Sequence, residues 1–158
     1  MLKSNIENLL EKEYAPLTTY QRNMWFDQCK QPEDPYYNIG GYLEINGDVE
    51  HRVFEESINQ LISDNDALRI TIENRDGQPF QRFISELTYK VELNDFSSME
   101  NAHDYIMDWM HIEFLKPFKM ENDILFEFHL IKEKDSYTIL LIILAKTRCI
   151  LWILIEKF

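Results

Sequence analysis

The histidine and cysteine side chains, which could act as a general base, a nucleophile or a metal ligand, are few. They are four histidines and two cysteines: His51, His103, His111, His129, Cys29 and Cys149. No serine–histidine–aspartate or cysteine–histidine set has usable spacing, and no Cys-x-x-Cys pair is present. We expect each histidine to be solvated or locally hydrogen-bonded, and Cys149 to be a buried, inert thiol. The sequence therefore predicts neither a catalytic set nor a metal site.

The acidic side chains do not form a metal-binding motif either. Glu11 with Glu13, and Glu121 with Asp123, are neighbours but lack the spacing of an EF-hand loop, so they are predicted to be solvated. The chain carries 16 Lys and Arg against 28 Asp and Glu, a net charge of -12. This is the wrong sign for contacts with nucleic acid or anionic lipid. We therefore expect no nucleic-acid partner and no membrane partner.

Length and composition predict one compact domain in a reducing compartment. The chain has 158 residues, of which 45% are apolar and 13% aromatic, enough for one core and short for two. Two distant cysteines give no disulfide framework, and the N-terminus lacks the apolar segment of a signal peptide. Lys146 and Arg148 divide the apolar residues 139–155 into stretches too short to cross a membrane. We expect a cytoplasmic protein.

Three helices are predicted from capping residues and apolar periodicity. The first and third begin at a Thr or Ser that is followed three residues on by Gln or Glu, the spacing of a capping box. The second is amphipathic over residues 49–63, where apolar side chains recur at helical spacing. The capping residues are Thr18, Asp48 and Ser97.

Strands are predicted between these helices. We expect one strand over residues 36–45, broken by Gly40-Gly41, a short one over 89–93, and hairpins over 68–84 and 125–144. The strand from residue 137 is nearly all apolar, as expected for a central strand covered on both faces. The predicted fold class is α/β (α+β), a mixed sheet of about five or six strands flanked by helices.

Residues 16–26 read Pro-Leu-Thr-Thr-Tyr-Gln-Arg-Asn-Met-Trp-Phe. This segment resembles the opening motif of the condensation domains of nonribosomal peptide synthetases, roughly Leu-Ser-x-x-Gln-x-x-Leu-Trp-Phe. Further similarities follow in family order. They are Tyr-Asn-Ile at 37–39, Ile-Asn-Gly-Asp-Val at 45–49, Ala-Leu-Arg-Ile-Thr at 67–71, Gly-Gln-Pro-Phe at 77–80 and Lys-Pro-Phe at 116–118. The ordered series covers about residues 15–142.

The resemblance implies a fold like chloramphenicol acetyltransferase, with two similar lobes and the reaction in a tunnel between them. Residues 1–158 would be a single N-terminal lobe, without the second lobe and with residues 143–158 degenerate. The family joins two acyl chains in antibiotic biosynthesis. Each arrives as a thioester on the phosphopantetheine arm of a carrier protein, so no cofactor is expected on this chain. Expected partners are a carrier protein or a C-terminal lobe.

The catalytic signature of the family, His-His-x-x-x-Asp-Gly, is absent from this sequence. The last histidine is His129, the last aspartate Asp135 and the last glycine Gly77, so no alignment of the C-terminal residues supplies it. Counting on from residue 142, the motif positions carry other residue types, among them Ala145, Lys146, Ile150 and Leu151. We expect no catalytic residue, and we attribute the altered stretch to a frameshift, gene decay or deliberate alteration.

Four residues that match family motifs are expected to have structural roles. They are Gln21, Arg22, Trp25 and Arg69. Asp64, Asn65 and Asp66 stand where the family has Arg, His and Glu, which agrees with decay of the site.

Three functions compete on these grounds. The chain is a truncated, inactive condensation lobe, a non-catalytic module that docks a carrier protein or lobe, or, least favoured, a small acyltransferase that completes its site by oligomerising. Because the apolar residues 139–155 would lack a covering lobe, we also expect self-association.

Overall fold

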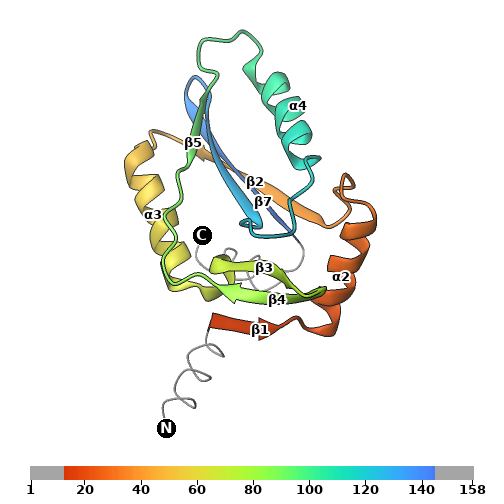
Figure 1. Ribbon diagram of the computed structural model, residues 1–158. Coiled ribbons are helices and arrows are strands. Elements are labelled where there is room, and N and C mark those ends of the chain that lie inside the picture. Colours follow the sequence, from red (N-terminus) through yellow and green to blue (C-terminus); the bar gives the residue numbers. More distant parts are fainter. Residues whose placement is uncertain (1–12, 145–158) are drawn as a thin grey trace.

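The chain folds as two sheets with helices packed against them (Figure 1). The computed structural model describes residues 13–144. Three helices, α2 (Thr19–Lys30), α3 (His51–Asp64) and α4 (Ala102–Phe114), alternate with seven strands and one short 3-10 helix, η1 (Asp66–Arg69).

The smaller sheet has three antiparallel strands in the order β1-β4-β3. They are β1 (Tyr14–Pro16), β3 (Ile70–Arg75) and β4 (Gln78–Phe83). The turn between β3 and β4 consists of Asp76 and Gly77, which have φ of 51° and 80°. Positive φ at both turn residues matches the right-handed twist of the flanking strands. The predicted hairpin is confirmed.

The larger sheet has four strands in the order β2-β7-β6-β5. They are β2 (Asn38–Asn46), β5 (Glu92–Asp95), β6 (Phe126–Lys132) and β7 (Ser136–Leu144). β7 is antiparallel to both neighbours, whereas β5 runs parallel to β6. The central position predicted for the apolar strand β7 is confirmed.

Two cores cover the two faces of the larger sheet. One core joins α3, through Phe54, Ile58 and Leu61, to side chains of β6 and β7. The other joins α4, through Ile106 and Met110, to the opposite face and to Trp25 of α2. Alternate residues of β6 and β7 therefore contact different helices, as the two-residue side-chain period of a strand requires.

Several details differ from the sequence prediction. The strands form two sheets rather than one, and β2 continues through its two glycines because both pair with β7. β5 begins at Glu92, later than expected. α3 is preceded by Glu50 rather than capped by Asp48. α4 follows Asn101, in a left-handed conformation with φ of 57°.

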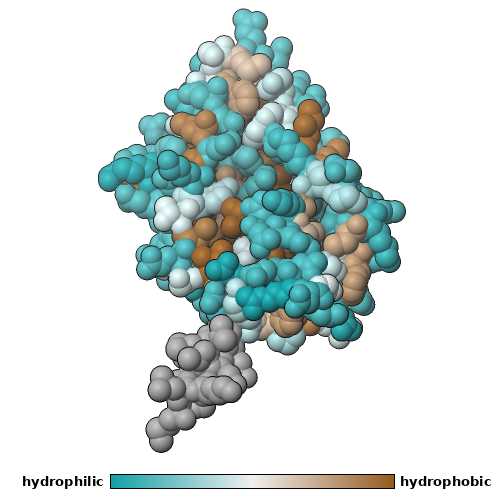
Figure 2. Space-filling view, viewed as in Figure 1, coloured by the Kyte–Doolittle hydropathy of each residue, from teal (hydrophilic) through white to brown (hydrophobic). Residues whose placement is uncertain are grey.

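Residues 139–144 lie in the middle of the sheet, and most of them are buried. In the described part of the chain, the long apolar run is thus covered by its own lobe. No helix among residues 13–144 is long and apolar enough to span a membrane. Hydrophilic residues form most of the face seen in Figure 2.

Candidate functional site

The end of β7 is the place from which the catalytic loop of the resembled family would follow. Leu144, the last described residue, pairs with Asn38 of β2, and its N–H donates to the carbonyl of Leu125 at 3.0 Å. The degenerate motif positions Ala145, Lys146, Ile150 and Leu151, like Cys149, lie outside the described residues.

Asn38 connects this end of the sheet to the end of α4. Its side-chain amide donates to the carbonyl oxygens of Phe114 and Lys116, at 2.7 and 2.8 Å. The residue is buried. The first bond satisfies a carbonyl that the last turn of α4 leaves without an intrahelical partner, and the second satisfies one just beyond the helix. Asn38 therefore fixes α4 beside the strand end.

The preceding residue, Tyr37, holds the loop between α2 and β2. Its hydroxyl donates to the Asp27 carboxylate at 3.0 Å. Desolvation and this hydrogen bond raise the pKa of Tyr37, because both favour the neutral phenol. The amide of Gln28 donates to three carbonyls of the same loop, including that of Asp34 at 2.8 Å. The loop is thereby tied to α2.

The opening motif places Gln21 between α2 and the smaller sheet. Gln21 completes the predicted capping box with Thr18, which is confirmed. Its amide also donates to the Gln81 side chain of β4 at 3.2 Å, and Gln81 in turn donates to the carbonyl of Pro16. One side chain thus caps the helix and attaches it to the sheet.

Trp25 and Arg22, from the same motif, have contrasting surroundings. Trp25 is buried in the core shared with α4, and its indole N–H has no hydrogen-bond partner among the described residues. The Arg22 side chain is exposed.

Arg69 binds the end of α3 to the segment after β4. Its guanidinium donates to the carbonyls of Ile62, Ser63 and Ile84, and it pairs with the carboxylate of Asp66. All of these contacts lie within its own lobe. Arg69, which matches a family motif, therefore anchors the backbone and takes no part in an arrangement of reactive groups.

Three of the histidines have ordinary surroundings. His51 lies 2.7 Å from the carbonyl of Val91 through its Nε2, and His103 and His111 are exposed on α4. The expectation of solvation or a local hydrogen bond does not hold for His129. This residue is buried, and neither ring nitrogen has a hydrogen-bond partner.

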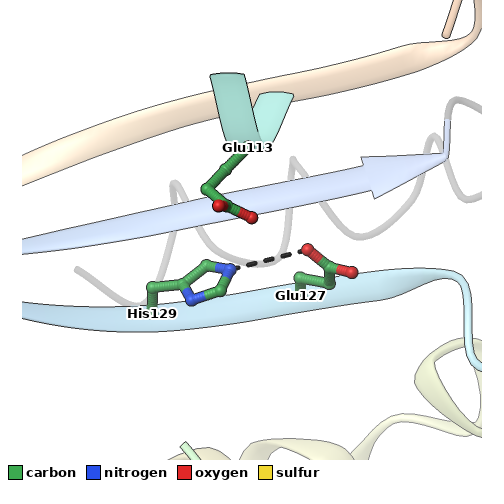
Figure 3. A group of neighbouring side chains, drawn as sticks. All are labelled: Glu113, Glu127 and His129. Carbon is green, nitrogen blue, oxygen red and sulfur yellow. Dashed lines mark ion pairs between the residues drawn. The ribbon is translucent and has the colours of Figure 1, made fainter. Parts of the chain in front are cut away.

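His129 lies beside two carboxylates, Glu127 of β6 and Glu113 of α4 (Figure 3). No sequence motif indicates this group. A signal was present, since Glu127 and His129 are two residues apart in a strand whose other residues before Lys132 are apolar. Spacing of two places both side chains on one face, but Glu113 joins them only through tertiary packing.

Comparison with known protein sequences finds condensation domains and nonribosomal peptide synthetases. A family model described as "Condensation domain" matches residues 11–143. The dimodular nonribosomal peptide synthase of Bacillus subtilis (strain 168) is 33% identical over 102 residues, which are 64% of this chain and 4% of that protein. Surfactin synthase subunit 1 of the same strain is 30% identical over 131 residues, 83% of this chain and 4% of that protein.

Solved structures agree as well. The starter condensation domain of rhizomide synthetase superposes with a TM-score of 0.79 at 24% identity, over 84% of this chain and 32% of that one. The first condensation domain of the calcium-dependent antibiotic synthetase gives a TM-score of 0.73 at 20% identity. The superposition covers 82% of this chain and 32% of that one.

The sequence matches and the superpositions each cover most of this chain. They confirm the predicted fold class, and the match over residues 11–143 covers more than half of the chain. The chain spans about a third of the solved condensation domains that it resembles, at 32%. It belongs to the condensation domain family of nonribosomal peptide synthetases.

Proposed function

We propose that this chain is the N-terminal lobe of a condensation domain and that these 158 residues catalyse no condensation by themselves. The observation that carries the proposal is the lack of any histidine after His129, of any aspartate after Asp135 and of any glycine after Gly77. The family signature requires all three residue types after the strand that corresponds to β7.

The altered residues offer no chemical substitute. In the family, the acceptor amine attacks the donor thioester, and the second histidine of the signature assists proton movement or orients the amine. Lys146 stands in its place. An ammonium group with an ordinary pKa of about 10.4 is already protonated at neutral pH and accepts no proton. Ile150, in place of the aspartate, has no polar atom in its side chain.

The remaining capacity of such a lobe is recognition. Condensation domains work with carrier protein domains, and their substrates arrive on phosphopantetheine. We therefore extend the proposal to a cytoplasmic chain that takes a carrier protein or a C-terminal lobe as partner, with no organic cofactor of its own. The alternative of a non-catalytic docking module differs only in that recognition would be its whole function.

A single-turnover assay tests the catalytic part. The chain is mixed with one carrier protein that holds a donor thioester and one that holds an acceptor, and the carrier-bound product is measured by mass spectrometry. An intact condensation domain from surfactin synthase subunit 1 serves as the active control. We expect product only with the control. Product above background that disappears in Lys146→Ala would contradict the proposal.

Binding is measured separately. Titration of the 15N-labelled chain with a phosphopantetheinylated carrier protein is expected to shift a confined set of amide resonances. An absence of shifts at saturating carrier would contradict the docking role and leave the chain without the proposed partner.

A further inference from the structure

The group formed by Glu113, Glu127 and His129 combines buried charge with an unsatisfied imidazole. Glu113 and His129 are each only 8% exposed. Glu127 reaches solvent with 40% of its side chain. The three side chains converge between the last turn of α4 and β6 (Figure 3).

The surroundings of His129 give its two ring nitrogens no hydrogen-bond partner. The ring packs edge-on against Trp109, with centroids 5.3 Å apart and planes at 89°. The Glu127 carboxylate lies 3.5 Å from Nε2, an ion pair when the ring is protonated, but this distance is too long for a normal hydrogen bond. Buried polar atoms without partners are rare and costly in folded proteins. The ring nitrogens of His129 are therefore available to bind a ligand from outside the chain.

The three potential ligand atoms, one from each side chain, all lie within 4.8 Å of one another. Ligand atoms of a tetrahedral zinc ion, bound at about 2.0–2.1 Å, are separated by roughly 3.3 Å. Rotation about the terminal bonds of the two glutamates can close this difference. Among residues 13–144, this is the one group of three such side chains that comes so close.

The charge of the group favours a cation. Lys116 donates a hydrogen bond to Glu113 and is itself more than half exposed. One ammonium against two carboxylates leaves one negative charge uncompensated. A divalent ion would balance the carboxylates and would give the imidazole the partner that it lacks.

The site is accessible from solvent. The three side chains line a cavity of about 560 Å³, whose other charged lining residues are Lys90, Glu92, Lys116, Lys119 and Asp123. An ion and its remaining waters can enter from this side. Three protein ligands with an open fourth position are the arrangement that zinc adopts in reactive sites, and an imidazole ligand disfavours calcium and magnesium.

We infer that Glu113, Glu127 and His129 bind a divalent transition-metal ion of the zinc class, with water completing its coordination. The ion would join the end of α4 to β6. This site does not depend on the proposed function, because none of its ligands belongs to the motif that the chain lacks.

The test uses the whole chain, freed of metal with EDTA and titrated with Co²⁺. We expect visible absorption of a Co²⁺ ion with four ligands, saturating at one equivalent and abolished by Zn²⁺. Glu127→Gln and His129→Gln each remove one ligand at similar volume, and each should weaken binding by more than about tenfold. His111→Ala, which alters an exposed histidine on α4, the helix that carries Glu113, should leave binding unchanged.

Thermal unfolding gives an independent readout. Zn²⁺ should raise the Tm of the wild-type chain and of His111→Ala but not that of Glu127→Gln, because a ligand that binds only the folded state stabilises it. Circular dichroism establishes that each variant is folded. If His129→Gln does not fold, the Co²⁺ titration of Glu127→Gln tests the site, because the Glu127 side chain is 40% exposed. Equal Co²⁺ binding by all variants, no Co²⁺ absorption, or an equal rise in Tm with Mg²⁺ or Ca²⁺ would overturn the inference.

Discussion

The side-chain amide of Asn38 lies 2.7 Å from the carbonyl oxygen of Phe114, so the first residue of β2 holds the last residue of α4. Asn38→Ala would remove both N–H donors and leave two part-buried carbonyls without these partners. We expect a loss of about 1–3 kcal/mol in the free energy of unfolding, measured with urea. Asn23→Ala, at an exposed position of α2, is the control and should change stability by less than about 0.5 kcal/mol. Equal effects of the two changes would contradict this role.

Gly40 and Gly41 form a matched pair in β2. A Cβ at Gly40 would lie 3.0 Å from both the Phe114 ring and the carbonyl oxygen of Leu141, whereas a Cβ at Gly41 would meet nothing within 4 Å. Gly40→Ala should therefore cost about 1–3 kcal/mol through overpacking. Gly41→Ala should be neutral or stabilise the fold by up to about 1 kcal/mol. Urea unfolding measures both, and a reversed order would show that α4 does not approach β2 this closely.

The elements that sequence analysis predicted correctly depend on local chemistry. The capping box of Thr18 and Gln21 needs only four neighbouring residues, and the turn at Asp76 and Gly77 needs only residues that accept positive φ. The apolar character of β7 indicates a central strand, because a strand buried on both faces has no solvent-facing row of polar side chains. The condensation-domain resemblance likewise follows from an ordered series of local motifs.

The features that were missed depend on competition or on long-range packing. Ser97 was predicted to cap α4, but its N–H and hydroxyl both bond to the Asp95 carboxylate. Such side-chain and backbone bonds compete with helix caps. The division into two sheets depends on pairing β2 with β7, which are far apart in sequence. Glu113 meets His129 only because α4 packs on β6, and no local pattern indicates that contact.

The Asp95 carboxylate provides a pH-dependent contribution to stability. Hydrogen bonds from Ser97 and the nearby Lys132 ammonium lower the pKa of Asp95 below its ordinary 3.8. A carboxyl whose pKa is lower in the folded state stabilises the fold above its unfolded pKa. This contribution disappears as the pH falls through the folded value.

Asp95→Asn should therefore destabilise the chain at neutral pH and have a smaller effect in acid, well below the ordinary pKa. Urea unfolding of both proteins across this pH range measures the difference. Asp104→Asn, at an exposed position in the first turn of α4, is the control for a general loss of negative charge. A difference that does not change with pH would show that hydrogen-bond geometry, rather than charge, accounts for the effect of Asp95.

The free edge of β2 is where we expect self-association to begin. β2 is an edge strand among the described residues, and Tyr42 and Leu43 are exposed on it, Leu43 by 48%. An unpaired edge with apolar side chains is a template for pairing with a second chain. The net charge of -12 opposes close approach, but salt near 0.15 M limits this repulsion to about 8 Å.

Sedimentation velocity at tens of micromolar should therefore show association that increases with salt. Leu43→Lys places a charge on the edge and should reduce the association. Val53→Lys adds the same charge on α3, at a side chain of similar exposure, 47%, and should not reduce it, because a positive charge lowers the net negative charge that opposes approach. A monomer at both low and high salt would contradict the prediction. An equal reduction by the two lysines would show that association does not begin at the edge of β2.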